Sequence, residues 1–110
     1  MDIQITARHF KAHESLREYA YNGVKRLERY YNGIVQSDVI LSFERSRNSL
    51  KVAEVHILVH GTLLKTIEKS EDFFKSIDMA LDKMERQLKR YKSKLHHRDK
   101  VTVRMIHEKV

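Results

Sequence analysis

Cationic side chains recur at helical spacing in the second half of the chain. Lys83, Arg86, Arg90 and Lys94 follow one another at intervals of 3, 4 and 4 residues. On a helix this spacing makes one continuous ridge, repeating about every 5–6 Å along the axis, close to the phosphate spacing of a nucleic-acid strand. Arginine adds bidentate bonds to phosphate, and Gln87 can bond phosphate, sugar or a base edge. The ridge therefore predicts contact with a nucleic-acid backbone.

The positive charge of the chain is concentrated in this stretch. Residues 83–100 hold eight lysines and arginines against two acids, whereas residues 1–82 hold twelve of each, and the formal net charge is +7. A helical wheel places Lys75 and Lys89 beside the ridge and Lys92 on its other flank. Such a concentration favours an anionic partner, and nucleic acid above all.

Two other interpretations of the same helix are possible. It could be an ordinary solvated face, with i,i+4 pairs joining Glu85 to Lys89 and Asp82 to Arg86. It could also lie on an anionic membrane, although its apolar side is needed to cover a sheet and it has no tryptophan. After Glu85 no acid follows until Asp99, and this imbalance favours nucleic acid.

The remaining chemistry is sparse. The chain has no cysteine, its seven histidines form no convincing ligand set, and no glycine-rich phosphate loop is present. Asp78 and Asp82 are spaced as charge-balancing carboxylates of one helix face, and acid/base catalysis by this pair is not expected. From these observations together we expect no metal and no cofactor. Tyr30 and Phe74 are candidates for stacking on bases, whereas Tyr31 and Phe73 are expected in the core.

Length and composition predict one globular domain. The chain has 110 residues, 41% of them hydrophobic and 34% charged, and no proline. We expect a soluble cytoplasmic protein, since the N-terminus has no basic-then-apolar leader and no apolar run approaches the roughly 18 residues of a membrane span.

Hydrophobic periodicity predicts six elements. An alternating strand is expected at 1–8, and a helix from Ser15, capped by a Ser15–Glu18 capping box and stopped by Asn32 and Gly33 in a left-handed C-cap. Three strands are expected at 34–44, 51–60 and 63–68. A second helix, capped by Ser70, carries an apolar stripe from Phe73 to Leu95. Residues 102–107 fit either a short strand or a frayed tail.

The element order predicts a two-layer α+β fold. In this β-α-β-β-β-α arrangement, a four-stranded, mostly antiparallel sheet carries two helices on one face, as in double-stranded-RNA-binding domains.

The run SEDFFKSIDMALDKMERQLKRYKSKL at residues 70–95 resembles the ribosome hibernation promoting factor family, also called ribosome-associated inhibitor A and, formerly, putative sigma-54 modulation protein. The opening ITARHF and the LERYY of the first helix fit as well. The resemblance covers residues 1–98, a ribosome-binding α+β domain, and leaves 99–110 as a C-terminal tail. The length is similar to the short form of the family, which lacks a further dimerisation domain.

The resemblance implies a non-enzymatic translation inhibitor of stress or stationary phase. Its partners would be whole ribosomes, the small ribosomal subunit and ribosomal RNA, with no membrane or DNA. It would occupy the channel between head and body and block the messenger RNA and transfer RNA sites. The implied RNA-binding residues are Lys83, Arg86, Gln87, Lys89, Arg90, Lys92 and Lys94 of the second helix, Lys25, Arg26 and Arg29 of the first helix, and Arg8.

The alternative function is a free-standing double-stranded RNA-binding module, a class with α-β-β-β-α order. Two features distinguish the chain from that class. It has an additional N-terminal strand, and acids (Glu71 and Asp72) stand at the start of the second helix in place of a basic cluster.

Overall fold

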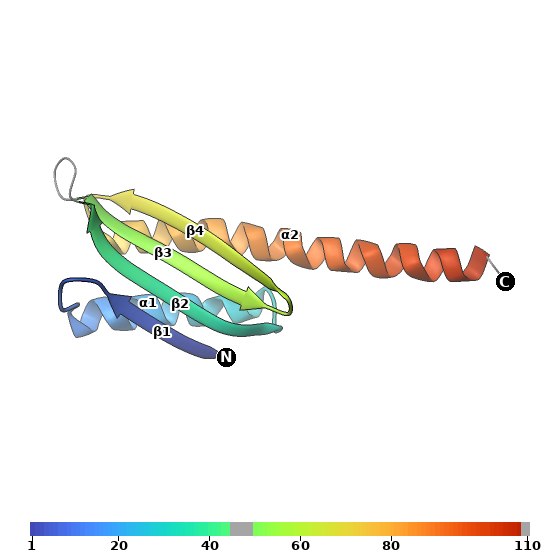
Figure 1. The fold of residues 1–110 in the computed structure, drawn as a ribbon, viewed down its shortest axis with the longest axis horizontal. Helices are drawn as coiled ribbons and strands as arrows, with labels where there is room; N and C mark the ends of the chain where they lie inside the picture. The colour runs from blue at the N-terminus through green and yellow to red at the C-terminus, as the bar shows by residue number, and fades with distance from the viewer. Residues whose placement is uncertain (45–49, 109–110) are drawn as a thin grey trace.

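The computed structural model describes residues 1–44 and 50–108, with side chains described as far as residue 95. The four strands are β1 (Asp2–Ala7), β2 (Ile34–Glu44), β3 (Leu50–Val59) and β4 (Thr62–Ser70). The helices are α1 (Glu14–Lys25), a short 3-10 helix η1 (Arg26–Arg29) and α2 (Phe73–Glu108). Both long helices lie on the same face of the sheet, so the predicted two-layer α+β architecture is confirmed (Figure 1).

The sheet is mixed, with strand order β1-β2-β3-β4. β1 runs parallel to β2, because α1 carries the chain back across the sheet between them, and the other two pairings are antiparallel. One row across the sheet pairs Ile5 with Val39, Val39 with Val55, and Val55 with Thr66. The tight β3–β4 connection places Gly61 at φ +73°, a conformation that glycine adopts at little cost. The similarity to double-stranded-RNA-binding domains stays a prediction.

The core lies between the sheet and both helices, and α1 contributes Leu16, Ala20 and Val24 to it. Ile77, Met84 and Leu88 have no solvent exposure, and they pack in one cluster with Val55 and Ile57 of β3. The predicted apolar stripe of α2 is therefore confirmed, and its burial fixes how the helix is rotated about its axis. The opposite face of the sheet carries exposed apolar side chains such as the cross-strand neighbours Leu58 and Leu63.

The first helix departs from its predicted ends. It begins at Glu14, and its N-cap residue, His13, makes no side-chain hydrogen bond, so the Ser15–Glu18 capping box is wrong. Gly33 also lacks the predicted left-handed conformation, since Gly61 is the glycine with positive φ among the described residues. The reason for glycine at residue 33 is a close approach: an added Cβ would lie 2.4 Å from Cε1 of Tyr31.

The second helix starts later and ends later than predicted. Asp72 caps it, because its Oδ1 accepts the backbone N–H of Phe74 at 3.1 Å, while Ser70 is the last residue of β4. α2 then continues for 36 residues to Glu108, far beyond the sheet (Figure 1). The short strand considered for 102–107 is therefore wrong. The boundary at residue 98 between a domain and a tail stays a prediction.

Among the described residues, none of the helices has the length and apolar character needed to cross a membrane.

Candidate nucleic-acid interface

The ridge residues of α2 point away from the core. Lys83, Arg86, Arg90 and Lys94 are all exposed, as expected when the opposite stripe is buried. Lys92, on another flank, is exposed too. For Arg86, Arg90, Lys92 and Lys94, no ion pair occurs within the described part of the chain. These four side chains are free to bind an external anion.

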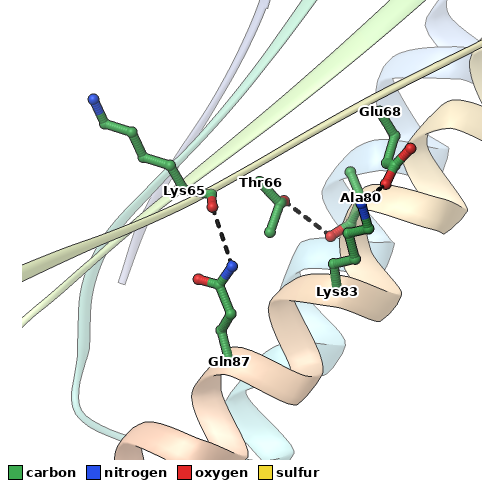
Figure 2. A network of polar contacts seen from close by, with 6 residues as sticks. All are labelled: Lys65, Thr66, Glu68, Ala80, Lys83 and Gln87. Atoms are coloured by element: carbon green, nitrogen blue, oxygen red, sulfur yellow. Dashed lines mark hydrogen bonds and ion pairs between the residues drawn. The ribbon is translucent and has the colours of Figure 1, made fainter.

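Two of the predicted RNA-binding residues join α2 to β4 (Figure 2). Lys83 forms an ion pair with Glu68, and Gln87 donates from Nε2 to the carbonyl oxygen of Lys65 at 3.2 Å. Between them the buried Thr66 donates from Oγ1 to the carbonyl oxygen of Ala80 at 3.0 Å. Lys83 and Gln87 therefore hold the edge strand to the helix, which their spacing in the sequence did not reveal.

Lys89, which the wheel places beside the ridge, has partners within the protein. Its ammonium group is 3.2 Å from Oε1 of Glu85, the predicted i,i+4 pair, and 4.9 Å from the ring centroid of Tyr30. The Tyr30 hydroxyl also hydrogen-bonds Glu85, and this bond raises the pKa of Tyr30. The same bond, with a second one from Lys89, lowers the pKa of Glu85 below its usual value. Lys89 is thus held in place by an acid and an aromatic ring.

Replacing Tyr30 by phenylalanine should raise the pKa of Glu85 towards its ordinary value. A carboxyl whose pKa is depressed by folding stabilises the fold above its unfolded pKa, and that stabilisation is lost as the pH falls through the folded pKa. The difference in stability between wild type and Tyr30→Phe should therefore be greatest at neutral pH and shrink in acid. An NMR titration of the Glu85 carboxyl carbon measures the shift, with Tyr21→Phe as an exposed control. An unchanged Glu85 pKa in Tyr30→Phe would contradict this network.

The three cations predicted on the first helix lie together where α1 passes into η1. Lys25, Arg26 and Arg29 are exposed and line an open hollow of about 600 Å³ with Asn22 and Glu28. Together they form a second basic surface, separate from the ridge.

An acidic groove lies between α1 and α2. Its volume is about 410 Å³, and its wall from α2 carries the carboxylates of Asp78, Asp82 and Glu85. Tyr19 of α1 closes one end by donating to Oδ1 of Asp78 at 2.5 Å. Arg26 of the α1–η1 surface also lines this groove. The helices' cations meet further along, where Arg29 and Lys92 line a hollow of about 280 Å³ with Glu28, Tyr30, Tyr31 and Asn32.

Arg8 lies at the other end of the domain. Its backbone N–H donates to the carbonyl oxygen of Leu41 at 2.9 Å, and Phe10, two residues later, stacks on Phe73 at 5.1 Å. Arg90 follows Phe73 by 17 residues of helix, which is about 25 Å at 1.5 Å per residue. The structure therefore does not bring Arg8 together with the ridge.

Sequence reasoning missed a hollow beside the ridge. Thr62 and Leu64 of β4 face Gln87, Arg90, Tyr91 and Lys94 of α2 around a volume of about 300 Å³. Nothing in the sequence links the β3–β4 turn to this part of α2, although an apolar stripe that includes Tyr91 does place that ring against the sheet. No group of acidic and histidine side chains within the described residues is arranged to hold a metal ion.

Residues 3–96 match the family described as sigma 54 modulation protein / S30EA ribosomal protein. Two curated relatives are named ribosome hibernation promotion factor. The one from Deinococcus radiodurans is 32% identical over 93 residues, which are 83% of this chain and 49% of the relative. The one from Staphylococcus aureus (strain COL) is 26% identical over 87 residues, which are 79% and 46%. The chain thus spans about half the length of these relatives.

Solved structures show the same fold. The Protein Y N-terminal domain from Thermus thermophilus superposes with a TM-score of 0.72 and 29% identity, covering 83% of this chain and 99% of that one. A ribosomal subunit interface protein from Coxiella burnetii gives a TM-score of 0.76 at 24% identity, with coverages of 84% and 99%. The fold resemblance expected from residues 1–98 is therefore confirmed.

Proposed function

Because the chain belongs to the sigma 54 modulation protein / S30EA ribosomal protein family, we propose that it is a ribosome hibernation factor. In this proposal it binds the small ribosomal subunit, performs no chemical reaction, and inhibits translation in stress or stationary phase. Its ligand is ribosomal RNA, and its cations contact phosphates without reading a base sequence.

The observation that carries the proposal is the set of exposed cations on α2 that have no ion-pair partner within the described residues. Arg86, Arg90, Lys92 and Lys94 are exposed and lie within nine consecutive residues of α2. Lys83 and Lys89, in contrast, already pair with acids of the protein itself. A cation that is paired internally must break that pair before it binds phosphate, so the four unpaired residues contribute most of the affinity. The α1–η1 surface supplies further phosphate contacts.

Translation would be inhibited because the protein occupies space that messenger RNA and transfer RNA need. The protein extends over 63 × 27 × 18 Å, a narrow body with one long helix. A body of this shape can enter an RNA-lined channel, and there it would exclude messenger RNA and transfer RNA by its volume. The residues of the basic surfaces act as anchors, and the sheet and the rest of the domain act as the obstacle.

Sedimentation of purified protein with ribosomes through a sucrose gradient tests the proposal. We expect the protein to travel with small subunits or whole ribosomes and to inhibit cell-free translation. Tight binding to isolated duplex RNA, with none to ribosomes, would overturn the proposal in favour of a double-stranded RNA-binding module.

Binding should weaken steeply as salt rises, because each phosphate contact releases condensed counterions. A plot of log affinity against log salt has a slope of about −0.7 to −0.9 per contact. Lys92→Gln should therefore reduce the magnitude of the slope by about one unit. Lys11→Gln, an exposed lysine ahead of α1, serves as the matched control and should leave the slope unchanged. Equal slopes for wild type and Lys92→Gln would remove Lys92 from the interface.

A further inference from the structure

We propose that the hollow between β4 and α2 binds one unpaired nucleotide of the RNA, an inference that rests on the proposed function. This β4–α2 hollow is lined by Thr62, Leu64, Gln87, Arg90, Tyr91 and Lys94. Two residues of β4 form one wall of the hollow, and two turns of α2 form the other. Its volume of about 300 Å³ is at the lower end of the range for small-ligand pockets.

The charged part of the hollow suits a phosphate. Arg90 and Lys94 are one helical turn apart, both are exposed, and neither has an ion-pair partner in the described residues. The guanidinium of arginine can hold two phosphate oxygens at once, and the lysine adds a point charge. The Thr62 hydroxyl on the opposite wall supplies a further hydrogen bond. Unlike the hollow beside Arg29, which includes Glu28, this one has no carboxylate in its lining.

The apolar part of the hollow suits a base. The Tyr91 ring packs edge-on against Tyr31, with centroids 5.5 Å apart and an interplanar angle of 78°. Its hydroxyl donates to the carbonyl oxygen of His60 at 3.3 Å. Because the ring is held at its edge and at its hydroxyl, it forms a fixed wall with Leu64. A base can pack on these two side chains without first ordering them, which lowers the entropy cost of binding.

Gln87 gives the hollow a polar group for the base edge. Its Nε2 is occupied by the carbonyl oxygen of Lys65, and Figure 2 shows its side-chain oxygen pointing away from that bond. The oxygen can therefore accept from an exocyclic amine, as adenine and cytosine offer. The bond to Lys65 fixes the orientation of the Gln87 amide, so its oxygen is already oriented before a base binds.

The combination selects an unpaired nucleotide over other anions. A base stacked inside a duplex cannot reach the Tyr91 and Leu64 wall, whereas a nucleotide in a loop or bulge can turn its base outward. Inorganic phosphate would use Arg90 and Lys94 but none of the apolar surface. The open hollow beside Lys25 and Arg26 also offers cations but has no aromatic ring in its lining.

Titration of the ¹⁵N-labelled full chain with adenosine 5′-monophosphate, and separately with inorganic phosphate, tests this inference by NMR. The nucleotide should shift the amide signals of Thr62 and Leu64 and the side-chain amide of Gln87, and these shifts should saturate. Phosphate should bind more weakly and should not shift the amide signal of Leu64. Nucleotide shifts spread evenly over all exposed cations, or shifts identical to those of phosphate, would overturn the inference.

Variants locate the site. Arg90→Gln should lower the affinity for the nucleotide by about tenfold or more, because it removes a charged hydrogen-bonding group. Tyr91→Leu keeps an apolar side chain but removes the ring, and should cost about fivefold. Lys11→Gln, an exposed lysine outside the lining and outside the proposed RNA contacts, should change nothing. Thermal unfolding of each variant checks that the fold persists. Equal affinity for wild type and Arg90→Gln would overturn the inference.

The two proposals fail separately. Wild-type protein that sediments with ribosomes but shows no saturable nucleotide shifts would overturn the β4–α2 hollow alone. Saturable shifts at Thr62 and Leu64 in a protein that does not bind ribosomes would overturn the ribosomal function.

Discussion

Replacing Arg86 and Arg90 together by glutamate should abolish retention on ribosomes and inhibition of cell-free translation. Both side chains are exposed and have no ion-pair partner within the described residues, so neither joins two parts of the fold through an ion pair. The change removes two phosphate contacts and places two carboxylates against RNA. A hydrogen bond to a charged group contributes about 1.5–3 kcal/mol, so the loss of both should weaken binding on the order of 100-fold or more. Co-sedimentation at fixed salt measures the loss.

A matched control separates local contact from net charge. Lys11→Glu with Lys75→Glu changes the total charge by the same amount at two exposed positions outside the proposed contacts. This control should lose far less affinity than Arg86→Glu with Arg90→Glu, and both proteins should show the thermal unfolding of wild type. If the Arg86 and Arg90 double variant inhibited translation at unchanged potency, the ridge of α2 would not be the RNA-binding surface.

Truncating Leu88 to alanine should lower the free energy of unfolding by about 2–5 kcal/mol, which is the range for leucine in a well-packed core. Leu88 has no solvent exposure and lies in the cluster that joins α2 to the sheet. Because the backbone of α2 is fixed, the surrounding side chains cannot fully fill the volume that the leucine leaves, and a cavity remains. Urea denaturation followed by circular dichroism measures the loss.

Leu58→Ala makes the same chemical change on the open face of the sheet. Leu58 is 37% exposed and faces Leu63 across the strand pair, so its truncation should cost about 1 kcal/mol or less. Similar losses for the two variants would mean that the face of the sheet turned away from the helices is packed against something as closely as the core is.

The apolar stripe of α2 was predictable because it depends on a single period. Side chains spaced 3 and 4 residues apart must share a side of any α-helix, so Ile77, Met84 and Leu88 identified the buried side before any fold was known. The order of strands and helices followed in the same way from local alternation, and with it the two-layer architecture.

The partners of the cations were not predictable because they come from other elements. A helical wheel gives an angle for Lys83 and for Lys89, but it does not say that Glu68 lies beside the first or Tyr30 beside the second. The acidic groove was hidden for the same reason. Asp78 looked like simple charge balance within one helix, whereas in the fold it accepts a hydrogen bond from Tyr19 of the other helix.

The ends of the helices depend on competition between nearby residues. Ser70 and Asp72 are both good N-caps, and pairing of Ser70 with Lys51 in the sheet leaves Asp72 as the cap. At the other end, β-branched residues such as Val101, Thr102 and Val103 lower helix propensity, which concealed the continuation of α2.

The bonds between β4 and α2 also occupy part of the edge that the sheet presents to other chains. β4 is an edge strand, and the free N–H and C=O groups of such a strand are a template on which another chain can add a strand and begin to aggregate. Here Gln87 occupies the carbonyl oxygen of Lys65, and lysines alternate with apolar residues along the strand at Lys65 and Lys69. An incoming strand would have to displace the amide and bury or repel these charges. The contacts that hold Gln87 and Lys83 against β4 thus leave part of this edge less available to another strand.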